Sequence, residues 1–326
     1  MKKILLTGGL GYIGKYFHEV NKSSYDITVL DTNFFGNIPG SNKNIILKDI
    51  RSVNLDDLKD IEVIIHMAEL SNDPLGDLNK KITKKINHDG TVRLLNLANN
   101  TQVTKFIYMS SASVYGFAEN IMDELSTTNP LTEYSKAKVA NENYILNNEL
   151  SFETIMLRNS TAFGFSKNLR LDLVVNDLTY GGFANGKINL LSDGTPKRPL
   201  VHIHDICSVI KKVIEDNRNL DKEIFNVGSS NMNFSIKEIA ETVGSILDLD
   251  EITFGQFDSD QRSYQVNFDK LNNFFPDFKI EYNLSKGIEN LVKNFKHYKL
   301  NGSEKRLKKL QSLIDNDNLT NDLYWN

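Results

Sequence analysis

The stretch TGGLGYIG, residues 7 to 14, follows the apolar run KILLT and decides the fold. From Gly9 it has the spacing G-x-G-x-x-G. Glycines there allow a sharp turn, a close approach of the backbone to a pyrophosphate, and tight packing of a helix that begins near Tyr12. Free N–H groups and a partial positive charge at the start of that helix favour phosphate. The stretch predicts a dinucleotide site, and a glycine turn without a ligand is the alternative. The residues of this stretch expected to hold the cofactor are Gly8, Gly11, Tyr12, Ile13 and Gly14.

The choice of dinucleotide depends on Asp31, which ends the next apolar run about 20 residues after Gly11. A carboxylate at this position can accept hydrogen bonds from the hydroxyls of the adenosine ribose. Its charge would repel a ribose 2′-phosphate, and the following TNFFGN offers no arginine or lysine to compensate. The sequence therefore predicts NAD rather than NADP.

Short apolar runs alternate with segments of helical period through the first half of the chain. The runs ITVL and VIIH do not alternate polar with apolar residues, as expected for strands covered on both faces. Repetition of strand, helix and strand predicts an α/β fold: a Rossmann-type doubly wound parallel sheet with a smaller C-terminal substrate lobe. The runs expected to form strands are KILLT, DITVLD, NIILKD, EVIIHMA, KFIYMSS and FETIMLRN.

The sequence becomes loop-rich after about residue 160, which marks a second lobe. Two later segments, residues 286–298 and 303–316, are amphipathic and are expected to dock on the body, with a subunit contact as the alternative for the second. The expected domains are an NAD-binding Rossmann domain of residues 1–160 with a returning segment around 197–228, and a substrate lobe with C-terminal helices formed by residues 161–196 and 229–326.

Composition and charge exclude several classes of protein. The 326 residues are 40% hydrophobic and 25% charged, which is ordinary for a globular chain, and a formal net charge of −4 argues against a nucleic-acid partner. Cys207 is the only cysteine, so a thiolate metal cluster is excluded and no metal site is expected. No stretch approaches the roughly 20 apolar residues of a membrane span, and the opening run is too short for a signal peptide. We expect a cytoplasmic protein without a membrane partner.

A second functional pattern lies in LTEYSKAKVANEN, residues 131 to 143, where Tyr134 and Lys138 stand one helical turn apart. Taken alone, such a pair is usually a solvated helix face. A free tyrosine has a pKa near about 10, too high for a base at neutral pH. A neighbouring ammonium group and the positive charge of an oxidised nicotinamide both favour phenolate, so the pair can also act as a base and the group that tunes it.

These motifs belong to a longer ordered set: TGGLGYIG, LKDIRS, IIHMAEL, KKINHDGT, YMSSASVYG, TEYSKAK and RPLVHIHD. Over residues 1 to about 300 the chain resembles the extended short-chain dehydrogenase/reductase family, the NAD-dependent nucleotide-sugar epimerases and dehydratases, including enzymes like UDP-glucose 4-epimerase. The resemblance implies NAD as cofactor and a catalytic set of Ser111, Tyr134 and Lys138. It implies further cofactor contacts from Asp49, Ile50, Met67, Ala68, Asn87, Tyr134, Lys138 and Ser160.

In such a site Tyr134 would take the proton from a sugar hydroxyl, Ser111 would hydrogen-bond the same oxygen, and Lys138 would hold the nicotinamide ribose. Asn87 lies on the apolar face of its predicted helix, so a hydrogen bond to backbone in the core is compatible with a role at the site. His66 is expected to be a satisfied strand-end histidine rather than a base. Glu69 departs from the small residue usual at its position in the family.

The resemblance also indicates the substrate side of the site. Arginine is suited to grip the diphosphate of a nucleotide sugar with two hydrogen bonds, although a surface ion pair is the alternative for each arginine. The expected substrate residues are Ser111, Thr161, Arg170, Asn176, Arg198 and Arg262.

The reaction type depends on two positions after Ser111. Dehydratases of the family typically place Asp-Glu there, whereas this chain has Ala112 and Ser113, so water loss is disfavoured. A 4-epimerase that passes through a transient 4-keto sugar is our first hypothesis, and a C4 dehydrogenase or 4-keto reductase is the alternative. A non-catalytic NAD-sensing protein is more remote, because both Tyr134 and Lys138 are present. The resemblance also suggests a homodimer and a role in bacterial surface-polysaccharide biosynthesis.

Overall fold

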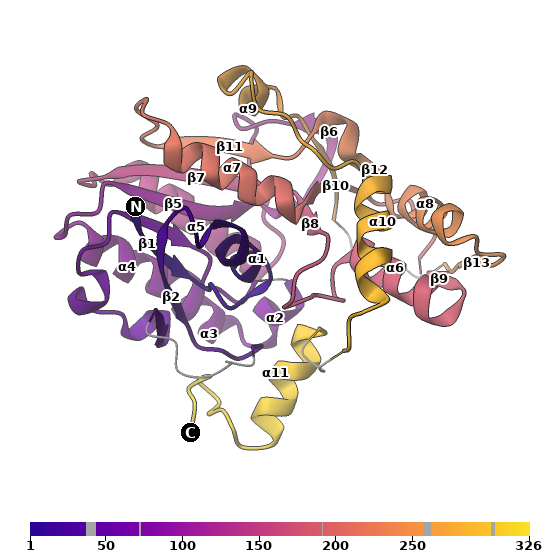
Figure 1. Cartoon of the computed structure of the whole chain (residues 1–326), viewed down its shortest axis with the longest axis horizontal. Coiled ribbons are helices and arrows are strands. Elements are labelled where there is room, and N and C mark those ends of the chain that lie inside the picture. Colours follow the sequence, from indigo (N-terminus) through magenta and orange to yellow (C-terminus); the bar gives the residue numbers. More distant parts are fainter. Residues whose placement is uncertain (37–43, 72, 191, 257–261, 301–303) are drawn as a thin grey trace.

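The structure is a computed structural model that describes residues 1–36, 44–71, 73–190, 192–256, 262–300 and 304–326. It consists of a large layered part, built mostly from the first half of the chain, and a smaller lobe beside it (Figure 1).

Seven parallel strands form the large sheet in the order β11-β7-β5-β4-β1-β2-β3. The chain starts at β1, runs to one edge through β2 and β3, and then crosses to β4 on the other side of β1. Ligands of such sheets bind at the carboxyl ends of the strands, where this reversal opens a crevice. The predicted Rossmann-type sheet is confirmed, and each run predicted to be a strand forms one. The strands are β1 Lys3–Thr7, β2 Asp26–Asp31, β3 Ile45–Leu47, β4 Val63–His66, β5 Lys105–Ser111, β7 Glu153–Asn159 and β11 Glu223–Val227.

Helices cover both faces of this sheet, which explains why its strands read as unbroken apolar runs. One apolar cluster holds Phe17 of α1 and Ile206 of α7 against one face, and a second holds Leu94 of α4 and Ile145 of α5 against the other. The helices of the first face are α1 Tyr12–Asn21, α7 Ile203–Glu215 and α9 Asp269–Phe274. Those of the second face are α2 Asp73–Leu78, α3 Lys80–Thr83, α4 Gly90–Ala98, α5 Glu133–Asn147 and α11 Arg306–Asp315.

The lobe packs three helices and short strands around its own apolar cluster. Ile288 and Leu291 of α10 lie fully buried in this cluster, so this amphipathic segment is docked, as predicted, through its apolar stripe, and its partner is the lobe. The lobe helices are α6 Val174–Asn185, α8 Ile236–Leu247 and α10 Leu284–Phe295. Its strands are β8 Thr161–Phe163, β9 Ile188–Leu190, β10 Lys197–His202, β12 Asn233–Ser235 and β13 Ile252–Phe254, and a further pair joins β6 Phe117–Met122 to β14 Ser263–Val266.

The segment 197–228, expected to return to the first domain, is divided between the two parts. Its strand β10 pairs with β8 and β12 in the small three-stranded sheet. Its helix α7 and strand β11 belong to the large layered part, where β11 forms an edge of the sheet beside β7. The return therefore begins at α7, because the backbone of β10 is already paired on both sides within the lobe.

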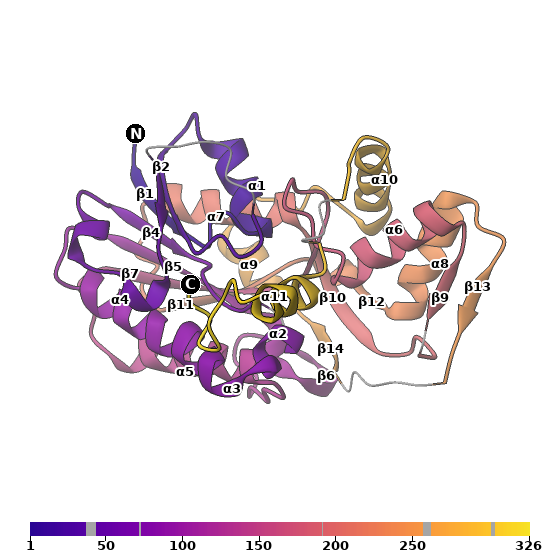
Figure 2. The same ribbon diagram turned by 90° about the horizontal axis from the view of Figure 1, so that it is seen from below.

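The second amphipathic segment forms α11, which docks on the layered part. Leu310 is fully buried and Leu313 is 7% exposed, both in the cluster that covers the α4 and α5 face of the sheet. Figure 2 shows α11, in yellow, at the boundary between the layered part and the lobe. The predicted docking of this segment on the body is confirmed.

Replacement of Leu291 by alanine should lower the free energy of unfolding by about 2–5 kcal/mol, because it leaves a cavity in the lobe cluster. Urea denaturation followed by circular dichroism measures the change. Leu125→Ala is the matched control: Leu125 is 95% exposed, and its replacement should change stability by no more than about 0.5 kcal/mol. Equal effects of the two substitutions would contradict the packing described for α10.

Candidate active site

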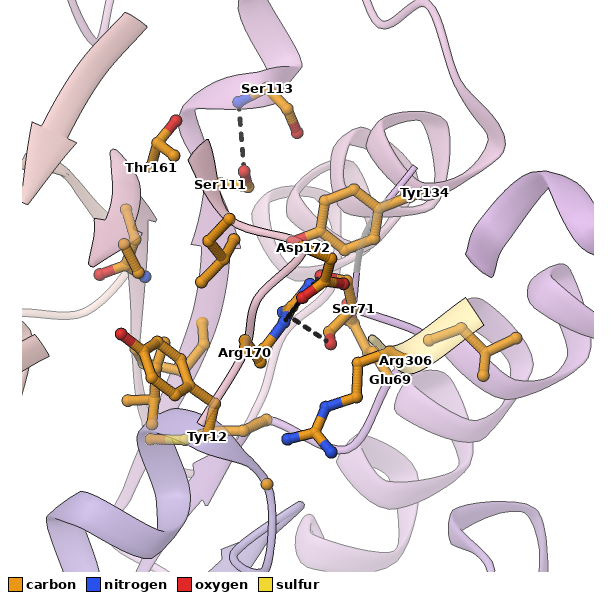
Figure 3. A pocket seen from close by; sticks show the side chains of 18 of the residues that line it. Tyr12, Glu69, Ser71, Ser111, Ser113, Tyr134, Thr161, Arg170, Asp172 and Arg306 are labelled. Atoms are coloured by element: carbon orange, nitrogen blue, oxygen red, sulfur yellow. Dashed lines mark hydrogen bonds and ion pairs between the residues drawn. The ribbon is translucent and has the colours of Figure 1, made fainter. Parts of the chain in front are cut away.

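A cavity of about 720 Å³ lies at the carboxyl ends of the parallel strands, between the layered part and the lobe. Its wall combines the glycine turn, the ends of β2, β4 and β5, one face of α5, the lobe and the start of α11. Figure 3 shows Tyr134, Ser111, Arg170, Glu69 and Arg306 around this space.

Most residues predicted for the site line this one cavity, although they come from separate parts of the sequence. Two predicted residues, Asn87 and Asn176, do not contribute to its wall. The predicted residues that do line it are Gly8, Gly11, Tyr12, Ile13, Gly14, Asp31, Asp49, Ile50, Met67, Ala68, Ser111, Tyr134, Lys138, Ser160, Thr161, Arg170, Arg198 and Arg262.

The glycine turn leaves no room for side chains. Gly8 has a φ of +70°, and a Cβ atom on it would lie 2.7 Å from the backbone of Met67. A Cβ on Gly14 would lie 2.6 Å from the carbonyl oxygen of Gly8. Helix α1 begins after Gly11, and no side chain caps its start. The free N–H groups of its first turn therefore lie at the end of the helix that lines the cavity. This bare, positively polarised turn fits a pyrophosphate.

Asp31 connects the glycine turn to the loop after β2. Its carboxylate accepts hydrogen bonds from the backbone N–H of Leu10 at 3.0 Å and from that of Asn33 at 2.7 Å. Burial raises its pKa, and these backbone hydrogen bonds act in the opposite direction. Asp31 therefore holds the turn in place from a position in the cavity wall where a ribose hydroxyl could reach it.

Tyr134 and Lys138 lie in the first half of α5, whose start is fixed by a capping box between Thr132 and Ser135. Tyr134 lies beside Ser111, the last residue of β5, whose side chain acts to lower the pKa of the Tyr134 hydroxyl. The Lys138 ammonium lies 5.3 Å from the centre of the Tyr134 ring. The structure thus brings the three predicted catalytic residues together at the wall of one cavity. Figure 3 shows two of them, Ser111 and Tyr134.

The ammonium of Lys138 is paired with a carboxylate that the family pattern does not include. Glu69 is buried beside it, with its Oε2 2.5 Å from Lys138 Nζ, and its Oε1 accepts a hydrogen bond from the Tyr108 hydroxyl at 2.9 Å. Lys138 also donates to the carbonyl oxygen of Met109. The family resemblance pointed to position 69 because a small residue is usual there, but only the structure shows the ion pair.

This ion pair changes the expected electrostatics of the base. From the sequence, the neighbouring ammonium of Lys138 is predicted to lower the pKa of Tyr134. In the structure the pKa of Tyr134 is raised above its ordinary value, first by burial and next by the negative charge of Glu69, while Ser111 and Arg170 act in the lowering direction. Glu69 compensates the charge of Lys138, so the lysine alone does not make Tyr134 a base.

His66 and Asn87 are satisfied structural groups. The His66 ring is hydrogen-bonded to Thr7 at 2.7 Å and to Thr91 at 2.8 Å, and burial lowers its pKa to about 3, as expected for a strand-end histidine that is not a base. Asn87 accepts from the N–H of Leu70 at 2.8 Å and donates to its carbonyl oxygen at 3.1 Å. Asn87 therefore acts on the cavity only through the loop at Leu70, which it holds in place. This is the buried hydrogen bond to backbone that the sequence allowed for it.

Two predicted substrate residues are tied to the lobe and to α1. Arg170 makes a bidentate ion pair with Asp172, with both N–O distances 2.9 Å, and a longer hydrogen bond to Ser71 at 3.3 Å. Asn176 donates to the Tyr12 hydroxyl at 3.2 Å and accepts from the N–H of Gly164 at 3.0 Å. Asn176 therefore joins the lobe to the first turn of α1 rather than lining the cavity.

Arg198 and Arg262 line the lobe side of the cavity next to one another. A guanidinium N–H of Arg198 donates to the carbonyl oxygen of Arg262, and its side chain is 6% exposed. Burial lowers the pKa of Arg262. A buried arginine, Arg198, and a partly buried one, Arg262, in the same wall make this end of the cavity suited to an anion.

Sequence reasoning missed one cationic residue of the wall, Arg306 at the start of α11. Arg306 shares a helical face with Leu310 and Leu313, and all three are buried. A charged residue on the apolar stripe of an amphipathic helix is a signal that the sequence does contain.

The part of the chain that the structure describes contains neither a cluster of metal ligands nor a membrane-spanning helix. In those residues no group of three or more His, Cys, Asp or Glu side chains is arranged to hold a metal ion. None of the helices found in the described ranges is long and apolar enough to cross a membrane.

A parallel Rossmann-type sheet, a bare glycine turn and a serine, tyrosine and lysine at one cavity define an extended short-chain dehydrogenase/reductase. Residues 4–228 match the model of the NAD dependent epimerase/dehydratase family. The chain belongs to this family, and NAD is its cofactor.

The relatives include epimerases and dehydratases. The chain is 30% identical over 237 residues to a putative UDP-glucose 4-epimerase of Methanocaldococcus jannaschii, covering 69% of this chain and 76% of the relative. Its fold is similar to a UDP-glucuronic acid 4-epimerase of Bacillus cereus solved with UDP-glucuronic acid and NAD (TM-score 0.78, 23% identity, 90% of this chain and 99% of that chain). It is also similar to a dTDP-glucose 4,6-dehydratase of Bacillus anthracis solved with NAD (TM-score 0.77, 24% identity, 91% and 97%).

Replacement of Glu69 by glutamine should move the acidic limb of the pH profile of kcat/KM to lower pH. Removal of the carboxylate leaves the charge of Lys138 uncompensated, which favours the phenolate of Tyr134 and lowers its pKa. Initial rates measured from about pH 5 to about pH 10 show where the acidic limb of kcat/KM lies.

Glu119→Gln is the control for this substitution, because Glu119 is exposed on β6 and its replacement should leave the profile unchanged. An acidic limb that stays in place, or moves to higher pH, in Glu69→Gln would show that Glu69 does not set the charge balance at Tyr134.

Proposed function

We propose that this chain is a nucleotide-sugar 4-epimerase. The observation that carries the proposal is that Tyr134 and Ser111 lie together at the wall of the cavity that also contains the glycine turn. When bound, NAD supplies a reversible hydride acceptor at this site. The relatives named for 4-epimerase activity support the choice of C4.

In the proposed reaction Tyr134, as phenolate, accepts the proton of the sugar 4-hydroxyl while C4 is oxidised to a ketone. The Ser111 hydroxyl donates a hydrogen bond to the same sugar oxygen and keeps it beside Tyr134. After the 4-keto sugar has turned over in the cavity, Tyr134 returns the proton to the oxygen as C4 is reduced from the opposite face. Lys138 holds the nicotinamide ribose and balances Glu69.

Two features support epimerisation over dehydration. Ala112 and Ser113 stand where dehydratases of the family place Asp-Glu, and neither can act as a carboxylic acid. Two carboxylates of the cavity wall are held in ion pairs, Glu69 with Lys138 and Asp172 with Arg170. The alternative of a C4 dehydrogenase or 4-keto reductase uses the same residues and differs only in whether the hydride returns.

On the substrate side we propose that Arg198 and Arg262 bind the diphosphate of the nucleotide sugar, with Thr161 and Arg170 nearer the sugar. The adjacent positions of the two arginines in the lobe wall support this assignment. Asn176 would contribute by holding Tyr12 and Gly164 in place.

Two further predictions concern the context of the enzyme. A homodimer formed through α5 and the helical segment that carries Asn87 is checked by light scattering on the purified protein. A role in bacterial surface-polysaccharide biosynthesis is checked by the surface glycans of a strain in which this chain is deleted.

A panel of UDP-, GDP- and dTDP-linked sugars tests the reaction. The epimerase should convert one of them to its C4 isomer, seen by proton NMR, without a net change in absorbance of reduced nicotinamide. Stoichiometric formation or consumption of NADH would refute the epimerase and support the dehydrogenase or reductase. Release of water with formation of a 4-keto-6-deoxy sugar would refute both.

Replacement of Tyr134 by phenylalanine should lower kcat by about 10²–10⁴-fold, because the proton acceptor is lost while the ring packing is retained. NAD content and thermal stability should stay close to wild type. Tyr144→Phe is the matched control on the same helix, since the Tyr144 hydroxyl is bonded to Asn96 outside the cavity. Unchanged turnover in Tyr134→Phe would rule out the proposed mechanism.

A further inference from the structure

The family match ends at residue 228, yet a later segment of the chain reaches the cofactor end of the cavity. Arg306, the first residue of α11, lines the cavity although its side chain is only 2% exposed. The helix cannot shift freely, because Leu310 and Leu313 anchor it in the core of the layered part. Figure 3 shows the guanidinium extending from α11 into the site.

The contacts of Arg306 tie it to the glycine turn. Its guanidinium donates to the side-chain oxygen of Asn168 at 2.6 Å and to the carbonyl oxygen of Asn168 at 3.0 Å. The amide of Asn168 in turn donates to the carbonyl oxygen of Leu10, inside the turn. The guanidinium also lies 4.7 Å from the centre of the Phe35 ring, in the loop after β2. Arg306 thus stands between the turn and the loop that enclose the dinucleotide end of the cavity.

The charge of Arg306 suits an anion at this place. Burial and the neighbouring Arg170 lower its pKa to about 10, which still leaves it a cation at neutral pH. Two acidic side chains act on it, Asp172 and Glu304, and Asp172 is itself in a bidentate pair with Arg170. A buried guanidinium that is linked through Asn168 to the turn before a bare helix start is suited to bind a phosphate group.

The segment after α11 contacts the adenosine end of the same cavity. The indole N–H of Trp325 donates to the carbonyl oxygen of Thr32 at 2.6 Å, and its ring lies 5.7 Å from that of Phe34. Arg51 donates to the carbonyl oxygen of Asp322 at 2.8 Å and lies under the ring of Tyr324 at 3.8 Å. Thr32 follows Asp31, and Arg51 is paired with Asp49, so the segment braces both loops of the adenosine end.

We propose that Arg306 binds the pyrophosphate of NAD, and that the docked segment 304–326 slows release of the dinucleotide. The proposal rests on NAD binding and not on the proposed reaction, so it can fail or succeed independently of the epimerase. The nucleotide sugar carries the same chemical group, a diphosphate, and the test separates the two sources.

Titration calorimetry of the full chain, freed of nucleotide, measures affinity for NAD and, separately, for UDP, GDP and dTDP as probes of the sugar-nucleotide site. Arg306→Ala should weaken NAD binding by about 10-fold or more, the effect of losing a charge-assisted hydrogen bond, and should leave the affinity for the nucleoside diphosphates unchanged. Arg306→Lys keeps the positive charge but loses the planar guanidinium that can donate two parallel hydrogen bonds. Its affinity for NAD should therefore lie between those of Arg306→Ala and wild type. Arg218→Ala is the control, since Arg218 is paired with Asp216 outside the cavity.

Unchanged NAD affinity in Arg306→Ala would overturn the assignment, and so would weakened binding of a nucleoside diphosphate with normal NAD binding. If Arg306→Ala does not fold, Arg306→Lys decides: an affinity for NAD equal to wild type at unchanged melting temperature overturns the proposal. The bracing segment is tested by the rate of release of labelled NAD into excess unlabelled NAD. Trp325→Leu should release it several-fold faster, and an unchanged rate would refute the part played by the segment.

Discussion

The close approach of Gly8, Gly14 and the backbone after β4 is the constraint on which the site depends. A Cβ atom on Gly14 would lie 2.6 Å from the carbonyl oxygen of Gly8, and one on Gly8 would meet the backbone of Met67. Because these segments touch, helix α1 starts directly over the crevice where the strand order reverses, and its unsatisfied N–H groups become part of the cavity wall. Asp31 secures the turn from the next strand through the N–H of Leu10.

The second determinant of the site is a balance of buried charges. Alone, Lys138 would bring an uncompensated positive charge next to Tyr134. Glu69 compensates this charge, because its Oε2 lies 2.5 Å from Lys138 Nζ, and its Oε1 accepts a hydrogen bond from Tyr108. Such a pair is costly to bury and costly to break from one side. The proton affinity of Tyr134 is therefore set jointly by burial, by the ion pair, by Ser111 and by the charge that a bound nicotinamide brings.

The sequence predicted the large sheet well, because its strands are continuous apolar runs and the glycine spacing places the first helix. Asp31 could be named because it ends the strand that follows the glycine turn. Ser111 and Tyr134 could be named because their motifs resemble those of the family. The small sheets of the lobe could not be predicted, since β8, β9 and β12 are three-residue strands without a periodic pattern. The pairing of Glu69 with Lys138 and the entry of Arg306 depend on contacts between distant parts of the chain.

The docking of α11 also has a consequence for how the chain folds. Leu310, Leu313, Leu319 and Leu323 share one apolar cluster with Leu5 and Leu30. These partners are separated by almost the whole sequence, and such long-range contacts slow folding because a large loop must be closed before they form. The part of this cluster that α11 covers can be closed only after the residues of α11 have been synthesised. The first strand of the sheet and the last helix of the chain therefore complete one core together.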